Sequence, residues 1–176
     1  MKALTILILI LIAAISIYGL ALWGGQPFGS VGEQTLDYAK QGIDKLIAWG
    51  EGTSPESTER RIEEAYELTN VKRKENGLLP FQRSEELEDL AKIHAQDMYK
   101  RKNCDHLGFD GRADKAQMAG FNLVAENCAE GGYEASSFID LWMTSPGHRA
   151  NLLNPELTHI GIGIYGKYAV QLFGGY

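Results

Sequence analysis

The feature that most constrains this chain is an uncharged, apolar stretch near its amino terminus, residues 3 to 23 (ALTILILILIAAISIYGLALW). About 20 apolar residues in a helix are enough to cross the hydrocarbon core of a bilayer. We therefore expect a transmembrane helix here. A cleaved signal peptide is the alternative, although its apolar region is typically only about 7–15 residues long.

The charges around this stretch predict its orientation. Lys2 precedes it, and the next Lys or Arg is Lys40. The positive-inside rule then places the amino terminus in the cytoplasm and the carboxyl-terminal domain outside the cell. We expect a single-pass protein of the cell membrane, secreted if the segment is cleaved. The net charge of −6 and the absence of a basic block argue against a nucleic-acid partner.

The remaining chain has the composition of one globular domain with extra segments. Residues 24–57 begin with the turn-rich GGQPFGSVG, continue with an amphipathic stretch that predicts a helix weakened by Gly42, and end in the linker-like EGTSPES (Glu51 to Ser57). We therefore divide the chain into a membrane anchor or signal peptide (1–23), a linker with an amphipathic helix (24–57) and a folded domain (58–176).

Within residues 58–176, apolar spacing predicts three helices. The first ends at Asn76-Gly77, Ser84 caps the second, and the third lies in YEASSFIDLWMTS and ends at Pro146-Gly147. We expect the following side chains to face inward: Ile62, Ala65, Tyr66, Thr69, Leu87, Leu90, Ala91, His94, Met98, Phe138, Leu141 and Trp142.

The other segments read as loops and strands. Residues 103–132 are rich in glycine and lack a long periodic pattern, which predicts ordered loops with one short helix around RADKAQMAG. IGIGIY and YAVQLF, separated by Gly166-Lys167, predict two antiparallel strands joined by a type II′ turn.

Three polar stretches contain residues with suitable side chains for chemistry: NCDHLG with His106, AENCAEGG with Glu126, and SPGHRANLL with His148. The two histidines are far apart in sequence, and HExxH, CxxC and GxSxG patterns are absent. Spacing alone therefore supports only a weak site hypothesis. His94 lies on an apolar helix face, which indicates a packed and hydrogen-bonded core histidine instead of a ligand.

The two cysteines flank these stretches. Cys104 lies two residues before His106, and Cys128 lies two residues after Glu126. On an oxidising side of the membrane we expect a disulfide between them, which would bring His106 and Glu126 close together. Two free, buried cysteines are the alternative.

The order H...AENCA...W.TSPGHRANLLNPELTHIGIGIY...YAVQLFG resembles the CAP superfamily, also called the SCP-like or cysteine-rich secretory protein, antigen 5 and pathogenesis-related 1 domain, in its bacterial or archaeal form. The match covers about residues 59 to 176. The resemblance implies an α+β fold, an α/β/α sandwich with a small antiparallel sheet between helical layers. It also implies a cleft with two histidines and acidic residues, which in many members binds zinc or another divalent metal.

Carried over to this chain, the resemblance assigns the cleft to His106, Glu126 and His148, with His106 and His148 as the metal ligands. Ser145 lies where eukaryotic members often have a glutamate, which puts any mechanism that needs two carboxylates in doubt. The trio could instead form a hydrogen-bonded cluster. His159, at the entrance of a predicted strand, is interpreted as structural.

These residues lead to three functional hypotheses. The first is a non-catalytic binding module that presents its cleft to a lipid, peptide, glycan or partner protein. The second is a metal-dependent hydrolase with Glu126 as general base. The third is a serine hydrolase built on Ser145 and His148, for which the sequence contains no oxyanion-hole pattern and no third member.

Overall fold

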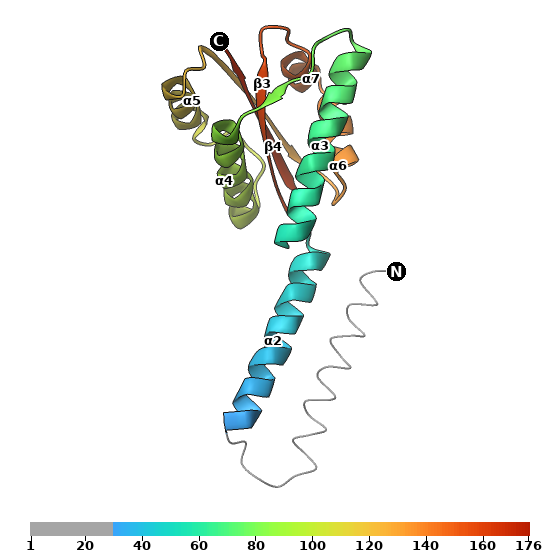
Figure 1. Ribbon diagram of the computed structural model, residues 1–176, viewed down its shortest axis with the longest axis vertical. Coiled ribbons are helices and arrows are strands. Elements are labelled where there is room, and N and C mark those ends of the chain that lie inside the picture. Colours follow the sequence, from blue (N-terminus) through green and yellow to red (C-terminus); the bar gives the residue numbers. More distant parts are fainter. Residues whose placement is uncertain (1–29) are drawn as a thin grey trace. The chain divides into compact units, whose positions relative to one another are not determined.

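The computed structural model describes residues 30–176, with side chains from Asp37 onward (Figure 1). These residues belong to two compact units that part between Ser54 and Pro55. The predicted anchor, residues 1–23, lies outside the described residues. Across residues 30–176, the structure contains no helix with both the length and the apolar character that crossing a membrane requires.

The first unit contains a single described helix, α2 (Ser30–Gly50). This helix covers the stretch for which an amphipathic helix is predicted, and it continues through Gly42. Several of its large apolar side chains are exposed, namely Tyr38, Leu46, Ile47 and Trp49. After the helix ends, the backbone N–H and the hydroxyl of Thr53 both donate to the Ala48 carbonyl, at 2.8 and 3.2 Å.

The second unit is a sandwich of helices around a four-stranded sheet. Its elements are α3 (Pro55–Glu75), β1 (Gln82–Arg83), α4 (Glu85–Arg101), α5 (Phe109–Met118), β2 (Leu123–Glu130), α6 (Ala135–Thr144), α7 (Pro146–Leu152), β3 (His159–Tyr165) and β4 (Tyr168–Gly175). One core joins α4 and α5 to the sheet, and a second core joins α3, α6 and α7 to its other face (Figure 1). The predicted α/β/α layering and α+β class are therefore confirmed.

The sheet differs from the prediction in two respects. Its strand order is β1-β3-β4-β2, and β1 pairs with β3 in parallel, so the sheet is mixed and not purely antiparallel. The second difference is β2, which lies in a segment predicted as loops. Its eight residues pair with β4 from Leu123 opposite Gly175 to Glu130 opposite Tyr168. This pairing is a long-range contact, which the local pattern of β2 does not indicate.

The alternation in IGIGIY has a direct structural cause. Ile160, Ile162 and Ile164 belong to the core under α3 and α6. On the other face, a Cβ added at Gly163 would lie 2.2 Å from the backbone carbon of Ala91. The backbone of α4 therefore packs directly on β3, which requires glycine at this position.

Local signals in the sequence mark several ends of elements correctly. The Ser84 hydroxyl accepts a hydrogen bond from Leu87 N–H at 3.3 Å, which confirms the helix cap. Gly166 has a φ of 57° and Lys167 a φ that is not positive, as a type II′ turn requires. The predicted helix around RADKAQMAG is α5.

One prediction for the third helix needs correction, and Pro146 has an additional role. Phe138 and Trp142 are buried, but Leu141 is 43% exposed. Pro146 also does more than end α6. It is the first residue of α7, where proline is favoured because the first helical N–H needs no partner within the helix. The signature SPGHRANLL is therefore mostly helical.

Candidate functional site

The candidate site is built around Glu126 on the edge strand β2. Because side chains alternate along a strand, Glu126 lies on the same face as Cys128, toward α4 and α5. The Glu126 side chain is only 1% exposed. A buried carboxylate requires partners that compensate for its lost hydration.

Arg112, on α5, is the main partner of Glu126. Its Nε donates to Oε2 at 2.6 Å and its Nη2 donates to Oε1 at 2.8 Å, which is a two-pronged ion pair. A third donor, Nη1, binds the Leu107 carbonyl at 2.9 Å. Burial raises the pKa of Glu126, but the hydrogen bonds from Arg112 and His106 outweigh it and lower the pKa overall. Glu126 is therefore charged at neutral pH.

His106 contacts the same carboxylate, with Nδ1 2.9 Å from Glu126 Oε1. Donation from Nδ1 to the carboxylate leaves Nε2 as the acceptor or ligand atom of the neutral ring. The His106 side chain is 53% exposed, so the ring extends from a buried anchor into solvent.

The loop that carries His106 is fixed by ion pairs and hydrogen bonds. Arg101 binds both carboxylate oxygens of Asp105 at 2.8 Å, and Asp105 accepts the backbone N–H of Leu107 at 3.1 Å. The buried His94 donates from Nε2 to the Asp105 carbonyl at 2.8 Å. His94 is thus a packed, hydrogen-bonded core histidine, as predicted, and it supports the loop next to the site.

His148 approaches from α7, in the first turn of that helix. Burial lowers the pKa of His148, and the positive charge of His106 lowers it further. His148 therefore favours its neutral form. The structure brings His106 and Glu126 into direct contact, and the His148 backbone carbonyl is joined to the neighbouring Asn127.

Asn127, next to Glu126, connects β2 to α7. Its side chain points to the opposite face of the sheet, where Nδ2 donates to the His148 carbonyl at 3.0 Å and to Gln171 Oε1 at 3.1 Å. Asn151 in turn donates to Asn127 Oδ1 at 3.0 Å. The AEN and SPGHRANLL motifs are therefore physically joined, and this connection positions His148 relative to Glu126.

Ser145, the fourth residue assigned to the cleft, lies between α6 and α7. Its backbone carbonyl accepts the N–H of Arg149 at 2.9 Å. His159 begins β3, where its ring packs against those of Phe121 and Tyr176, 5.4 and 5.0 Å away, and these two rings also stack on each other. This aromatic cluster is consistent with the structural role that the sequence suggests for His159.

The predicted disulfide is wrong, because Cys104 and Cys128 are both free. The Cys128 thiol instead donates to Glu126 Oε1 at 3.4 Å and lies 3.6 Å from His106 Nδ1. Burial raises the pKa of Cys128, and the negative charge of Glu126 raises it further. The sulfur is thus a neutral partner within the hydrogen-bonded cluster.

Two sets of residues could be considered for a metal ion. Among the described residues, His94, Glu126 and Cys128 bring three ligand atoms within 4.8 Å of one another. This buried set fits poorly, because Glu126 is paired with Arg112 and a thiol must lose its proton to bind metal. The second set is His106 and His148, the pair that the family resemblance assigns. A histidine ligand usually donates its other ring nitrogen to a carboxylate, as His106 does to Glu126.

Sequence reasoning missed Arg112 and the role of Cys128. The only signal for Arg112 was its place in a short predicted helix after the His106 loop. Nothing in the sequence indicates that its partner is Glu126, because the fold alone brings α5 against β2.

Comparison with known proteins places this arrangement in a family. Residues 66–173 match the CAP family, described as the cysteine-rich secretory protein family. The chain is 35% identical over 115 residues to YkwD of Bacillus subtilis, which covers 63% of this chain and 45% of YkwD. It is 30% identical over 111 residues to the membrane protein YlbC of the same organism, which covers 61% of this chain and 32% of YlbC. The aligned region spans less than half the length of these relatives.

Solved structures show the same fold. An extracellular protein of Bacillus anthracis with an SCP domain superposes with a TM-score of 0.64 at 27% identity, covering 70% of this chain and 44% of that one. An outer surface protein of Borrelia burgdorferi gives a TM-score of 0.58 at 24% identity, covering 66% of this chain and 92% of that one. The family match covers more than half of the chain, so the chain belongs to the CAP, or cysteine-rich secretory protein, family.

Proposed function

We propose that this protein is a membrane-anchored, extracytoplasmic CAP domain that acts as a binding module. In this proposal, His106 and His148 together bind a divalent metal such as zinc, and the cleft binds an external lipid, peptide, glycan or protein ligand. The observation that supports it best is the pairing of Glu126. Both of its carboxylate oxygens accept hydrogen bonds from Arg112, and one also contacts His106.

This pairing argues against Glu126 as a general base. A general base must take a proton from water, yet a carboxylate with a lowered pKa and an arginine partner is a weak proton acceptor. The same geometry suits an orienting role, in which Glu126 fixes the His106 ring so that Nε2 is available to a metal. A metal held by two histidines has open coordination positions for an oxygen-bearing ligand.

The metal proposal can be tested by calorimetric zinc titration of the full-length chain. We expect His106→Ala and His148→Ala to abolish binding, with His159→Gln as the matched control that retains it. Undiminished binding in both alanine variants would overturn the proposed site. Binding should weaken below about pH 6.5, because protons compete for the imidazoles.

The choice between binding module and hydrolase needs a separate measurement. We expect the zinc-loaded protein to lack turnover in a screen of ester, amide and glycoside substrates. Turnover that disappears in Glu126→Gln, with zinc still bound, would establish the hydrolase instead.

The location rests on the apolar residues 3–23 and on Lys2. The name of YlbC as a membrane protein and the extracellular description of the Bacillus anthracis structure agree with it. Amino-terminal sequencing of membrane-extracted protein tests it, and a start after Trp23 would show that the segment is cleaved.

A further inference from the structure

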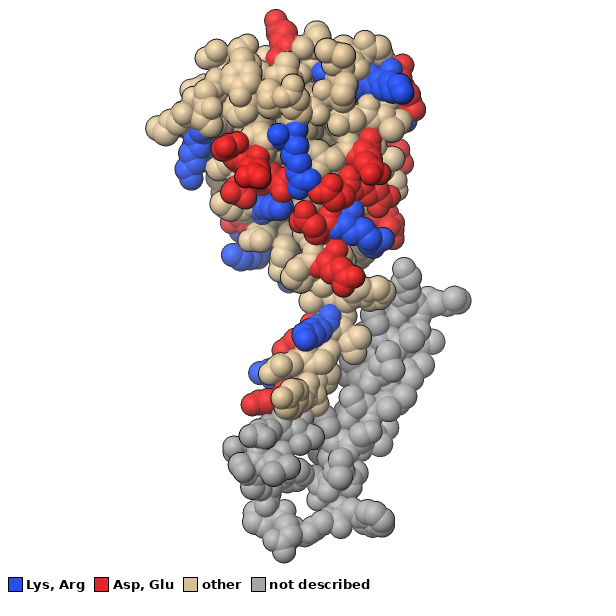
Figure 2. Space-filling view, in the orientation of Figure 1, with Lys and Arg blue, Asp and Glu red and all other residues tan. Residues whose placement is uncertain are grey.

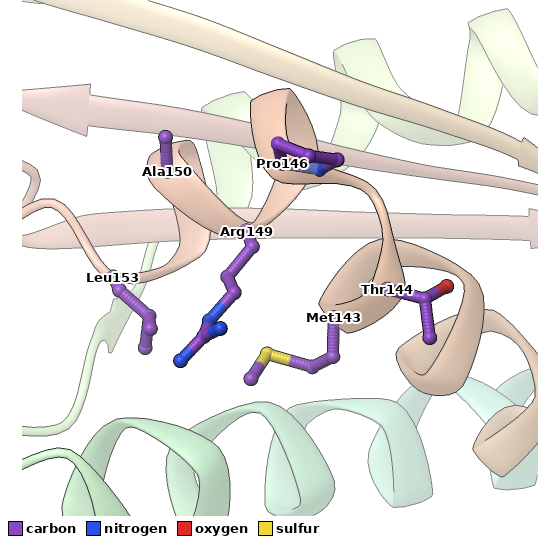
Figure 3. A pocket seen from close by; sticks show the side chains of 6 residues that line it. All are labelled: Met143, Thr144, Pro146, Arg149, Ala150 and Leu153. Carbon is purple, nitrogen blue, oxygen red and sulfur yellow. The ribbon is translucent and has the colours of Figure 1, made fainter.

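A pocket distinct from the His106–Glu126 cluster lies beside α6 and α7 (Figure 3). Its volume is about 430 Å³, which is within the range of small-ligand sites. It is lined by Met143, Thr144, Pro146, Arg149, Ala150 and Leu153. Neither His106 nor Glu126 lines it, so it is a separate place on the molecule.

Arg149 supplies the charge in this pocket. Within residues 37–176, its guanidinium has neither a hydrogen bond nor an ion pair, whereas Arg73, Arg83, Arg101 and Arg112 all donate to carbonyl or carboxylate oxygens. Figure 3 shows the Arg149 side chain extending from α7 between the side chains of Met143 and Leu153. A planar guanidinium with free donors matches a carboxylate, which it can bind through two parallel hydrogen bonds.

The surroundings of Arg149 are largely apolar. Met143 and Leu153 are half-buried and pack against the core below them. The Thr144 hydroxyl is already engaged, since it donates to the carbonyls of Asp140 and Leu141 within α6. The pocket therefore combines the unpaired guanidinium of Arg149 with the apolar side chains of Met143 and Leu153. The flexible methionine thioether can adjust to different ligand side chains.

We propose that this pocket binds the carboxyl-terminal carboxylate of a peptide whose last side chain is apolar. The carboxylate would pair with Arg149, and the side chain would contact Met143 and Leu153. Because the cleft residues take no part, this site is additional to the proposed function and does not depend on it.

The openness of the pocket favours a peptide over a fatty acid. Thr144, Pro146, Arg149 and Ala150 are all exposed, so the outer part of any ligand remains in water. A peptide backbone is well hydrated there. A long acyl chain would instead leave methylene groups in water, so it would lose the free energy of burying them.

Methyl NMR provides a direct test, because the chain has four methionines and Met143 is the one that lines the pocket. We would titrate acetyl-Gly-Gly-Leu, as the free acid and as the carboxyl-terminal amide, into the methyl-labelled full-length chain in lipid nanodiscs. The acid should shift the Met143 methyl signal, and the amide should bind at least about tenfold more weakly because it lacks the charge.

Variants of Arg149 separate the effect of its positive charge from the effect of the two-donor geometry of its guanidinium. We expect Arg149→Gln to weaken binding of the acid by about tenfold or more and Arg149→Lys to weaken it less, with exposed Arg60→Gln as the unchanged control. His106→Ala should leave peptide binding intact, so failure of the metal site would not affect this result. The proposal is overturned if the acid leaves Met143 unshifted, if the amide binds equally well, if Arg149→Gln has no effect, or if octanoate binds more tightly than the peptide.

Discussion

Arg112 and Glu126 form a buried, two-pronged ion pair that joins α5 to the edge strand β2, and the same Glu126 oxygen that accepts from Arg112 also contacts His106. The orientation of the His106 ring therefore depends on Arg112, which acts through Glu126. This makes Arg112 a positioning residue of the candidate site.

Replacing Arg112 should affect both stability and metal affinity. Arg112→Gln leaves the charge of Glu126 buried without its main partner, so we expect a loss of about 3 kcal/mol in the free energy of unfolding. Zinc affinity should fall by about 10-fold to 100-fold because His106 loses its orienting support. Urea unfolding and zinc titration measure the two effects.

Two control variants accompany Arg112→Gln: one removes a surface arginine, and the other removes Arg112 when Glu126 carries no charge. Arg60→Gln, on the surface, should change stability by less than about 0.5 kcal/mol. In a Glu126→Gln background, Arg112→Gln should cost much less than alone, because the buried charge is then absent. Equal costs in both backgrounds would contradict the assigned coupling.

Packing of α4 on β3 predicts a large effect from one methyl group. Gly163→Ala would place a Cβ 2.2 Å from the backbone carbon of Ala91, and backbone cannot rotate away as a side chain can. We expect a loss of about 3 kcal/mol or more. Gly111→Ala, in α5 with nothing within 4 Å of the added carbon, is the control and should be neutral or stabilising. Thermal unfolding of both variants decides, and equal melting temperatures would refute the close approach.

Glu88 should make stability depend on pH in the acid range. Burial raises its pKa, but hydrogen bonds from Arg83, Lys92 and Tyr66 outweigh burial and lower it to about 2. A pKa below the unfolded value of about 4.3 means that the carboxylate stabilises the fold above that value and loses this contribution as pH falls toward 2. Arg83 is 38% exposed, so solvent screening reduces the contribution to about 2 kcal/mol.

Comparison of Glu88→Gln with the unchanged chain tests this pH dependence. The difference in unfolding free energy should be largest near pH 7 and should shrink between about pH 5 and pH 2.5. Glu75→Gln, which removes an exposed pair with Lys72, should show almost no such trend. A difference that stays constant with pH would contradict the lowered pKa.

Figure 2 shows acidic and basic side chains interspersed over the face that α3 and α4 present.

The two thiols should be present but unreactive in the folded protein. Burial raises the pKa of Cys104 to about 11, together with the negative charges of Glu130, Asp105 and Glu126, and burial also raises that of Cys128. Since the thiolate is the reactive form, iodoacetamide at pH 8 should label both cysteines slowly until denaturant is added. Mass spectrometry without reductant should then find two alkylated thiols. Cysteines that resist labelling in the denatured, unreduced protein would instead indicate that the disulfide is present.

Much of the helical layer follows from local sequence. Ser84 accepts the Leu87 N–H, the apolar spacing of α3 and α4 matches their buried faces, and Gly166 forms the predicted turn. These features depend on residues within about one or two turns of each other, so the sequence contains the whole interaction. The resemblance to the family likewise assigns His106, Glu126 and His148 to one cleft.

Contacts between distant segments had to come from the tertiary structure. β2 exists because it pairs with β4, whose residues lie about 40 to 50 positions away, as Asn127 opposite Gln171 shows. The same packing brings Arg112 to Glu126 and directs the Cys128 thiol toward that carboxylate instead of into a disulfide. The sequence by itself determined the helices and the hairpin, because short-range hydrogen bonds and periodicity encode them, and the family resemblance supplied the candidate histidines. The tertiary structure alone decided that Arg112 neutralises Glu126 and how the His106 ring is oriented. A buried carboxylate needs a charged partner, and only the packing of distant segments determines which residues are buried together.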